Sequence, residues 1–180
     1  MDIRKIGVIF VFSFSLCLIS CKKECEQCSP QGITENYIRY EGKTYELRSG
    51  RLEYYGIWDD NPAPNIDLIL YTDQGTEYYE IYFQLFTESN QLESGCYQFN
   101  GETRRPDTYN NSYFYMIRHN FNTDRDETVY PAIALNDGTV EVLRNGNEYK
   151  IGIDCSSGNG QPFTASFKGK LPYYNMRTDF

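Results

Sequence analysis

Apolar and polar residues alternate most regularly near the C-terminal end of the chain. In NEYKIGID, residues 147–154, a tyrosine and two isoleucines are separated by lysine and glycine. In PFTASFKGKL, residues 162–171, Phe163, Ala165 and Phe167 alternate with threonine, serine and lysine. Because successive side chains of a strand point to opposite faces of a sheet, each segment has one apolar and one polar face. The pattern predicts antiparallel strands that cover a core with one face only.

Turn-forming residues separate similar segments every ten or so residues from Asn36 onward. Asp137-Gly138 precedes the segment TVEVLR and Asn145-Gly146 follows it, and both pairs favour the positive φ angles of tight hairpin turns. No segment has a sustained helical period. Further strands are expected at Tyr37–Tyr40, Thr44–Arg48, Leu52–Ile57, Ile66–Thr72, Glu77–Phe86, Cys96–Asn100, Tyr113–Asn120 and Val129–Leu135.

These strands predict one all-β domain over residues 36–175, followed by a C-terminal tail, residues 176–180. Consecutive hairpins favour an antiparallel meander, which forms either a β-sandwich or a flattened lipocalin-like β-barrel. Residues Arg104–Ser112 contain Pro106 and the formal glycosylation sequon Asn110-Asn111-Ser112, and they are expected to form an exposed loop.

The N-terminal pattern differs from the rest of the chain. Arg4 and Lys5 precede an uninterrupted, largely apolar run from Ile6 to Ser20, which is the layout of a secretory signal peptide. Its end, Leu18-Ile19-Ser20-Cys21, resembles the bacterial lipobox. The resemblance implies a signal peptide over residues 1–20, Cys21 as the lipidated first residue of the mature chain, and a polar tether over residues 21–35. The alternative is an ordinary signal peptide cleaved near Ser20.

Charge narrows the range of partners. Removal of residues 1–20 leaves 15 basic and 24 acidic residues and a formal net charge of −9. Nucleic acid is an unfavourable partner, because phosphate binding requires clustered lysine and arginine. The lipid on Cys21 instead predicts attachment to a membrane, since two or more acyl chains anchor firmly.

Four cysteines remain after the signal peptide and Cys21 are set aside: Cys25, Cys28, Cys96 and Cys155. An even number in an exported protein predicts disulfides, with three connectivities open. The leading pairing is a local Cys25–Cys28 bond together with a Cys96–Cys155 bond. The CxxC spacing also occurs in redox and zinc sites, but the tether supplies neither a helix start nor further metal ligands. Neither a metal nor a cofactor is expected.

Candidates for catalysis are few. His119 is the single histidine and lies near the end of an expected strand, where a structural or exposed role is favoured over that of a catalytic base. Residues 122–127, NTDRDE, begin like a calcium-binding loop, but Glu127 and Ile133 occupy the positions that need glycine and an acid. A solvated charged loop is the better interpretation. The sequence therefore predicts a protein that is not an enzyme.

The single tryptophan, Trp58, precedes Asp59 and Asp60 in a loop-like segment. An indole beside carboxylates can stack on a sugar ring while the polar groups bind its hydroxyls. Trp58, Asp59 and Asp60 are therefore the candidate ligand-binding residues. The competing interpretation, that Trp58 caps one end of the sheet core, is favoured.

Five segments together resemble a group of small, tyrosine-rich lipoproteins of the Bacteroidales type: GKTYELRSGRLEYYG, NIDLILYT, LESGCYQF, DGTVEVLRNGNEYKIGID and FKGKLPYY. The resemblance covers roughly residues 40 to 174 and depends on hairpin spacing and on the placement of glycine and tyrosine. It implies a β-sandwich or lipocalin-like barrel attached to the outer membrane, and it implies no catalytic activity.

These observations predict a non-enzymatic, lipid-anchored protein of the cell envelope that acts as a binding or accessory module. It is expected to be a monomeric domain whose partner is a glycan, a small ligand or another envelope protein. The alternative functions are a small-ligand or glycan-binding β-barrel and, less favoured, a glycan-active enzyme with two carboxylates in a cleft.

Overall fold

The computed structural model describes residues 33–57, 62–72, 76–102, 104–120, 125–128 and 132–177. Within these ranges the chain forms strands and connections without a helix, so it offers no helix that could cross a bilayer. The strands are β1 (Tyr37–Tyr40), β2 (Lys43–Glu46), β3 (Ser49–Gly56), β4 (Asn65–Tyr71), β5 (Glu77–Phe86), β6 (Gly95–Phe99), β7 (Thr108–Asn120), β8 (Arg125–Thr128), β9 (Ile133–Asn145), β10 (Glu148–Ser157), β11 (Pro162–Lys170) and β12 (Tyr173–Asn175).

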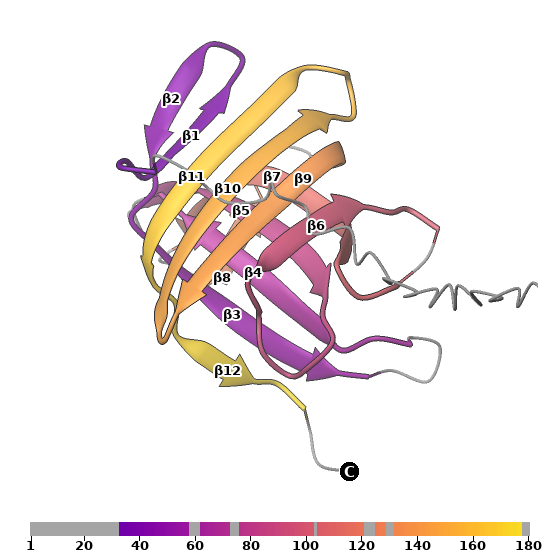
Figure 1. The fold of residues 1–180 in the computed structure, drawn as a ribbon. Helices are drawn as coiled ribbons and strands as arrows, with labels where there is room; N and C mark the ends of the chain where they lie inside the picture. Colours follow the sequence, from indigo (N-terminus) through magenta and orange to yellow (C-terminus); the bar gives the residue numbers. More distant parts are fainter. Residues whose placement is uncertain are drawn as a thin grey trace, which may run out of the picture.

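All twelve strands belong to one strongly curled sheet that forms a half-barrel, so the predicted all-β, lipocalin-like class is confirmed. The strand order is β12-β3-β4-β5-β7-β6-β9-β10-β11-β1-β2, and β8 also pairs with β7. In Figure 1, the wall formed by β9, β10 and β11 crosses in front of the wall formed by β3, β4 and β5, and the β1–β2 hairpin projects beside β11.

The predicted meander is correct for two runs of strands and wrong between them. Strands β3, β4 and β5 follow one another in the sheet, as do β9, β10 and β11. Strand β6, however, lies between β7 and β9 and runs parallel to β7, and β12 runs parallel to β3. The sheet is therefore mixed, because local turn residues do not determine where a strand that follows a long connection will pair.

Side chains from both walls fill the space inside the curl. Phe83 from β5 and Phe163 from β11 are fully buried, and Tyr97 from β6 is only 1% exposed. Tyr40, Phe114 and Phe163 form a chain of ring contacts between the walls, with centroids 5.3 to 6.1 Å apart. The alternation predicted for β10 and β11 is confirmed, since Ile151, Ile153 and Phe167 all belong to this core.

One predicted turn is confirmed and another is wrong. Asn145 pairs with Glu148, and Gly146 has a φ of 62° at the first position of the two-residue β9–β10 turn. Asp137-Gly138 instead lies inside β9 as a bulge, with φ angles of 51° and 86°. The same positive φ angles serve a bulge as well as a turn. A side chain on Gly138 would also collide with the backbone of Asp154, so this position requires glycine.

The expected loop Arg104–Ser112 is wrong at its C-terminal end, because β7 begins at Thr108. Tyr109 is completely buried and contacts the rings of Phe83 and Phe99, 5.1 and 5.5 Å away. Asn111, with a φ of 40°, lies in a bulge opposite β5 and does not end the strand. Packing of one aromatic ring therefore extends a strand through an asparagine-rich segment.

The charged segment 122–127 also differs from the expected loop, because its last residues belong to β8, which pairs with β7. The segment 121–124 lies outside the described residues. Of the strand expected at Val129–Leu135, residues 129–131 also lie outside them, and the part from Ile133 onward belongs to β9.

Candidate functional site

The ligand-binding residues that the sequence predicted, Trp58, Asp59 and Asp60, lie outside the described residues. So do Cys21, Cys25 and Cys28, and their predicted roles stay predictions. The backbone of His119 lies in β7 opposite Asp126, while its side chain is outside the description.

The predicted Cys96–Cys155 disulfide does not agree with the structure, which has no bond between these residues. Cys96 lies in β6 opposite Glu141 of β9, and Cys155 lies in β10 opposite Gly138 on the other side of β9. Two strands separated by a third are about 9 to 10 Å apart, and disulfides need Cα atoms within about 7 Å. Cys155 instead lies 3.2 Å from the Tyr109 hydroxyl in the core, where burial raises its pKa to about 11.

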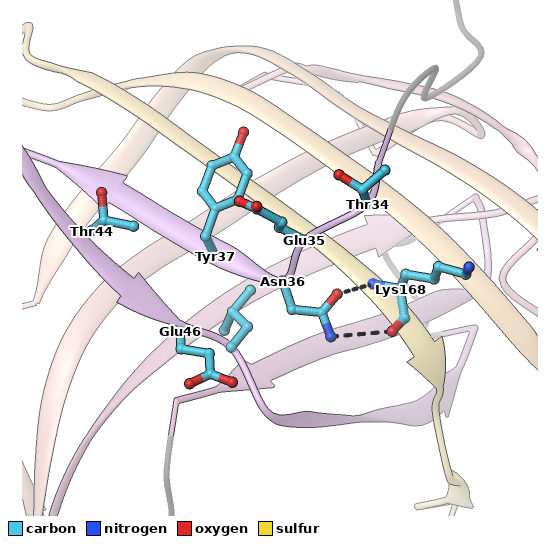
Figure 2. Close-up of a pocket in the computed structure, with 8 residues that line it drawn as sticks. Thr34, Glu35, Asn36, Tyr37, Thr44, Glu46 and Lys168 are labelled. Atoms are coloured by element: carbon cyan, nitrogen blue, oxygen red, sulfur yellow. Dashed lines mark hydrogen bonds between the residues drawn. The ribbon is translucent and has the colours of Figure 1, made fainter.

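A depression of about 610 Å³ lies where the described chain enters the domain, between the β1–β2 hairpin and β11. Figure 2 shows the Asn36 amide bonded to the backbone of Lys168, with distances of 2.7 and 3.2 Å. The Lys168 amine, the Glu46 carboxylate and the Tyr37 hydroxyl point in different directions. The Asn36 bonds attach the start of the domain to β11. Because the charged and polar side chains do not converge, the depression forms no catalytic arrangement.

A more organised set of polar groups lies on the outer surface of β3, β4, β5 and β7. Since the core-facing residues of these strands alternate with outward-facing ones, polar and aromatic side chains from four neighbouring strands come together there. We call this surface the tyrosine–carboxylate face. It comprises Glu53, Tyr55, Asp67, Tyr71, Tyr78, Glu80, Tyr82, Tyr113 and Tyr115.

The carboxylates of this face each accept a hydrogen bond from a tyrosine. The Tyr55 hydroxyl donates to Glu53 over 2.8 Å, and the Tyr82 hydroxyl donates to Asp67 over 2.9 Å. Further bonds join Tyr115 to Glu80, Arg51 to Glu53 and Asn65 to Asp67. The bonds from Tyr82 to Asp67 and from Tyr115 to Glu80 join neighbouring strands, and the others lie within one strand. Together they hold the acceptors and donors in fixed positions.

The centre of the face is buried although it lies on the outside of the sheet. Every residue of β4 is buried, and Asp67 is only 6% exposed. Side chains of the flanking strands cover the outer side of this central strand. Burial, with a smaller contribution from the neighbouring Glu53, raises the pKa of Asp67 to about 6, although the bonds from Tyr82 and Asn65 oppose the rise.

Burial also keeps Tyr55, Tyr82 and Tyr115 of the face neutral. It raises the pKa of Tyr55 to about 12 and raises the pKa values of Tyr82 and Tyr115 well above the ordinary value. The carboxylates that accept their hydrogen bonds raise these pKa values further. The phenols are therefore fixed hydrogen-bond donors at any physiological pH.

The rings of the face are also ordered. Tyr82 and Tyr113 stack with centroids 6.4 Å apart, and Tyr71 contacts the edge of Tyr78 at 5.8 Å. The Arg51 guanidinium lies 5.0 Å from the Tyr71 ring. Within the described part of the chain, the Tyr71 hydroxyl is buried without a hydrogen-bond partner, as is Oδ1 of Asn65. Unsatisfied groups of this kind are uncommon and cost free energy.

The face continues at one end into a depression of about 650 Å³. The Asn111 side chain donates a hydrogen bond to Gln84 of β5 over 2.9 Å. Gln84 lies directly opposite Asp67 of β4. Arg104 and Arg105 also line this depression. An extended ligand could therefore run from the stacked rings into the depression.

Sequence reasoning missed this face, because it recognised β3, β4 and β5 as strands without assigning their polar sides. A signal was present in NIDLILY, where asparagine, aspartate and tyrosine occupy alternate positions of an otherwise apolar strand. Polar residues in a central strand are normally hydrogen-bonded. The spacing could have predicted a buried polar network, but not the partners from β5 and β7.

We expect Asp67 to make the folded protein less stable as pH rises from about 4 to 7. Its pKa is about 6 in the folded state and 3.8 without burial, so the folded state holds the proton more tightly. Its proton contributes roughly 2 to 3 kcal/mol to the free energy of unfolding. This contribution is fully present below about pH 4 and is lost as the pH rises through 6. Urea unfolding across this range should show the loss in the wild type and not in Asp67→Asn. The exposed Glu46→Gln is the control, and equal slopes for wild type and Asp67→Asn would contradict the assignment.

Comparison with known proteins gives no relative on which a function could be based. No protein-family model matches the chain, and no curated protein or solved structure matches it.

Proposed function

We propose that the chain is an exported, lipid-anchored protein of the bacterial cell envelope that works as a non-enzymatic binding module. Its ligand is a neutral glycan, which lies on the tyrosine–carboxylate face. The observation that carries the proposal is the set of tyrosine hydroxyls bonded to half-buried and buried carboxylates across four strands. The membrane attachment rests on Cys21 and the apolar run before it.

The chemistry of the face suits a sugar. Aromatic side chains offer large apolar rings against which the C–H groups of a pyranose pack. The phenol oxygens of Tyr55, Tyr82 and Tyr115 already donate their protons to carboxylates, and they can still accept a hydrogen bond from a sugar hydroxyl. Glu53 is half-buried and has acceptor capacity beyond the bonds already described, since an ionised carboxylate offers about four lone-pair sites. Fixed groups reduce the entropy lost on binding.

Charge favours an uncharged ligand. One arginine, Arg51, accompanies the three acidic residues Glu53, Asp67 and Glu80, and the mature chain is acidic as a whole. Anionic polymers would be repelled by this surface. Large side chains such as Phe83 and Phe163 fill the space inside the curled sheet. This packing favours a binding site on the outer surface of the sheet.

A test of the proposal measures binding of neutral oligosaccharides built from glucose, mannose, xylose or N-acetylglucosamine to the mature protein by titration calorimetry. Tyr113→Ala removes one of the two stacked rings and should weaken binding roughly 3- to 10-fold. Tyr37→Ala is the matched control, because Tyr37 is a half-buried tyrosine of β1 under Arg39, outside the face. Unchanged affinity in Tyr113→Ala, or no binding of any of these glycans, would end the proposal.

A glycan-active enzyme is the second candidate, and the observation that favours it is the pair Glu53 and Asp67. They are direct cross-strand neighbours, and burial raises the pKa of Asp67 to about 6. A carboxyl group with a raised pKa beside a second carboxylate is typical of the general acid in glycoside hydrolysis. Asp67 is, however, almost enclosed by Asn65 and Tyr82, so we prefer binding. Release of new reducing ends from a bound oligosaccharide would reverse that preference.

A further inference from the structure

A second pocket lies at one end of the sheet, away from the tyrosine–carboxylate face. It has a volume of about 230 Å³ and is lined by Gln91, Arg144, Asn147, Tyr149, Leu171 and Tyr173, and we call it the Arg144 pocket. Three separate parts of the chain build it: the connection after β5, the β9–β10 hairpin and the segment that leads into β12. Figure 1 shows this hairpin and β12 at the same end of the molecule.

Arg144 is held in place by neutral partners. Its Nε donates to the carbonyl of Gly146 over 2.9 Å, and its Nη1 donates to the side chain of Gln91. The guanidinium also lies 5.9 Å from the centre of the Tyr149 ring. These contacts fix the position of the guanidinium without neutralising its charge.

Among the described residues, Arg144 forms no ion pair, whereas Arg48, Arg51 and Arg118 each pair with a glutamate. The residues that line the pocket include no acid. The half-buried arginines of the described chain are Arg51, which pairs with Glu53, and Arg144, which has no acidic partner there. A planar guanidinium with unused donors is the geometry that binds a carboxylate with two parallel hydrogen bonds.

The remaining wall of the pocket is apolar and fixed. Tyr149 and Leu171 are each 6% exposed. The Tyr173 hydroxyl donates to the carbonyl of Asn90 over 2.8 Å, and the Tyr173 ring stacks on Tyr54. A site that combines apolar walls with a few converging polar groups is typical of small-ligand binding.

We propose that the Arg144 pocket binds a small organic carboxylate with a single-ring body. The carboxylate lies on the Arg144 guanidinium, and the ring packs against Tyr149 and Leu171. Asn147, at the exposed turn, contributes a side-chain amide at the rim. The site is independent of the tyrosine–carboxylate face, so either can fail without the other.

Saturation-transfer NMR on the full exported chain tests the proposal, with benzoate and cyclohexanecarboxylate as probes and benzamide as the neutral analogue. The two carboxylates should bind, and benzamide should bind much more weakly. Arg144→Gln should weaken carboxylate binding roughly 10-fold or more, because it removes a charge-assisted pair. Arg39→Gln is the matched control: Arg39 lies 4.2 Å above the Tyr37 ring on β1, outside the pocket.

A second variant keeps the test decisive if Arg144→Gln does not fold. Asn147→Asp places a negative charge at the rim, at an exposed turn position that accepts aspartate, and should also weaken carboxylate binding. Failure of both carboxylates to bind the wild type would overturn the proposal. Equal binding of benzamide, or unchanged binding in a folded Arg144→Gln or in Asn147→Asp, would overturn it as well.

Discussion

Replacement of Cys21 by alanine is expected to move the protein from the membrane fraction to a soluble or unprocessed form. The thiol of Cys21 is the acceptor of the diacylglyceryl group in the proposed lipoprotein, and alanine offers no atom for that bond. Each buried methylene of an acyl chain contributes about 0.8 kcal/mol to membrane binding, so loss of the lipid removes the anchor entirely. Cell fractionation with labelled palmitate measures both the location and the modification.

Cys17→Ala is the matched control for this experiment, because Cys17 lies within the apolar run before the cleavage site. It should leave location and labelling unchanged. The lipoprotein assignment would be wrong if Cys21→Ala fractionated like the wild type, or if the wild type took up no labelled fatty acid. An ordinary signal peptide would then be the better account of residues 1–20.

Tyr109→Ala is expected to reduce the free energy of unfolding by about 3 to 5 kcal/mol, the usual cost of removing a buried aromatic side chain. Tyr109 is completely buried, and its ring contacts Phe83 and Phe99. Its hydroxyl donates to the carbonyl of Asp137 over 2.6 Å. This bond connects β7 to the bulge of β9, so the substitution removes both a packed ring and a link between strands. Urea unfolding of the wild type and the variant measures the loss.

Tyr174→Ala is the control, since Tyr174 of β12 is 50% exposed and its loss should change stability by about 0.5 kcal/mol or less. The contrast tests the fold directly. If Tyr109 lay in the exposed loop that the asparagine-rich segment suggests, the two variants would behave alike. Equal stability of Tyr109→Ala and Tyr174→Ala would thus contradict the start of β7 at Thr108.

The residues of the candidate binding surface could not be grouped from the sequence. The tryptophan and two aspartates at residues 58–60 were predicted to bind a ligand because an indole and two carboxylates are adjacent in the sequence. The tyrosine–carboxylate face instead combines residues that are distant in sequence, such as Glu80 and Tyr115. Each of them is an ordinary strand residue by itself. Only the register between β5 and β7 places them opposite one another.

The cysteines show the same limit. Their even number, in a chain predicted to be exported, predicted disulfides, and the long loop between Cys96 and Cys155 favoured that pairing. The pairing depends on which strand lies between β6 and β10, and the placement of β9 there separates the two residues. The spacing of cysteines along the chain does not show the order of strands in the sheet, because that order is decided by packing.

The sequence by itself determined the all-β class, most strand positions and the β9–β10 turn, because side-chain alternation and glycine conformations act over a few residues. Glu77–Phe86 was predicted with the bounds that β5 has in the structure. Only the tertiary structure decided the insertion of β6, the bulge at Gly138 and the burial of Tyr109. It alone also decided the raised pKa of Asp67 and the position of Arg144. These features depend on contacts between strands far apart in the chain, where the free energy of packing outweighs local preference.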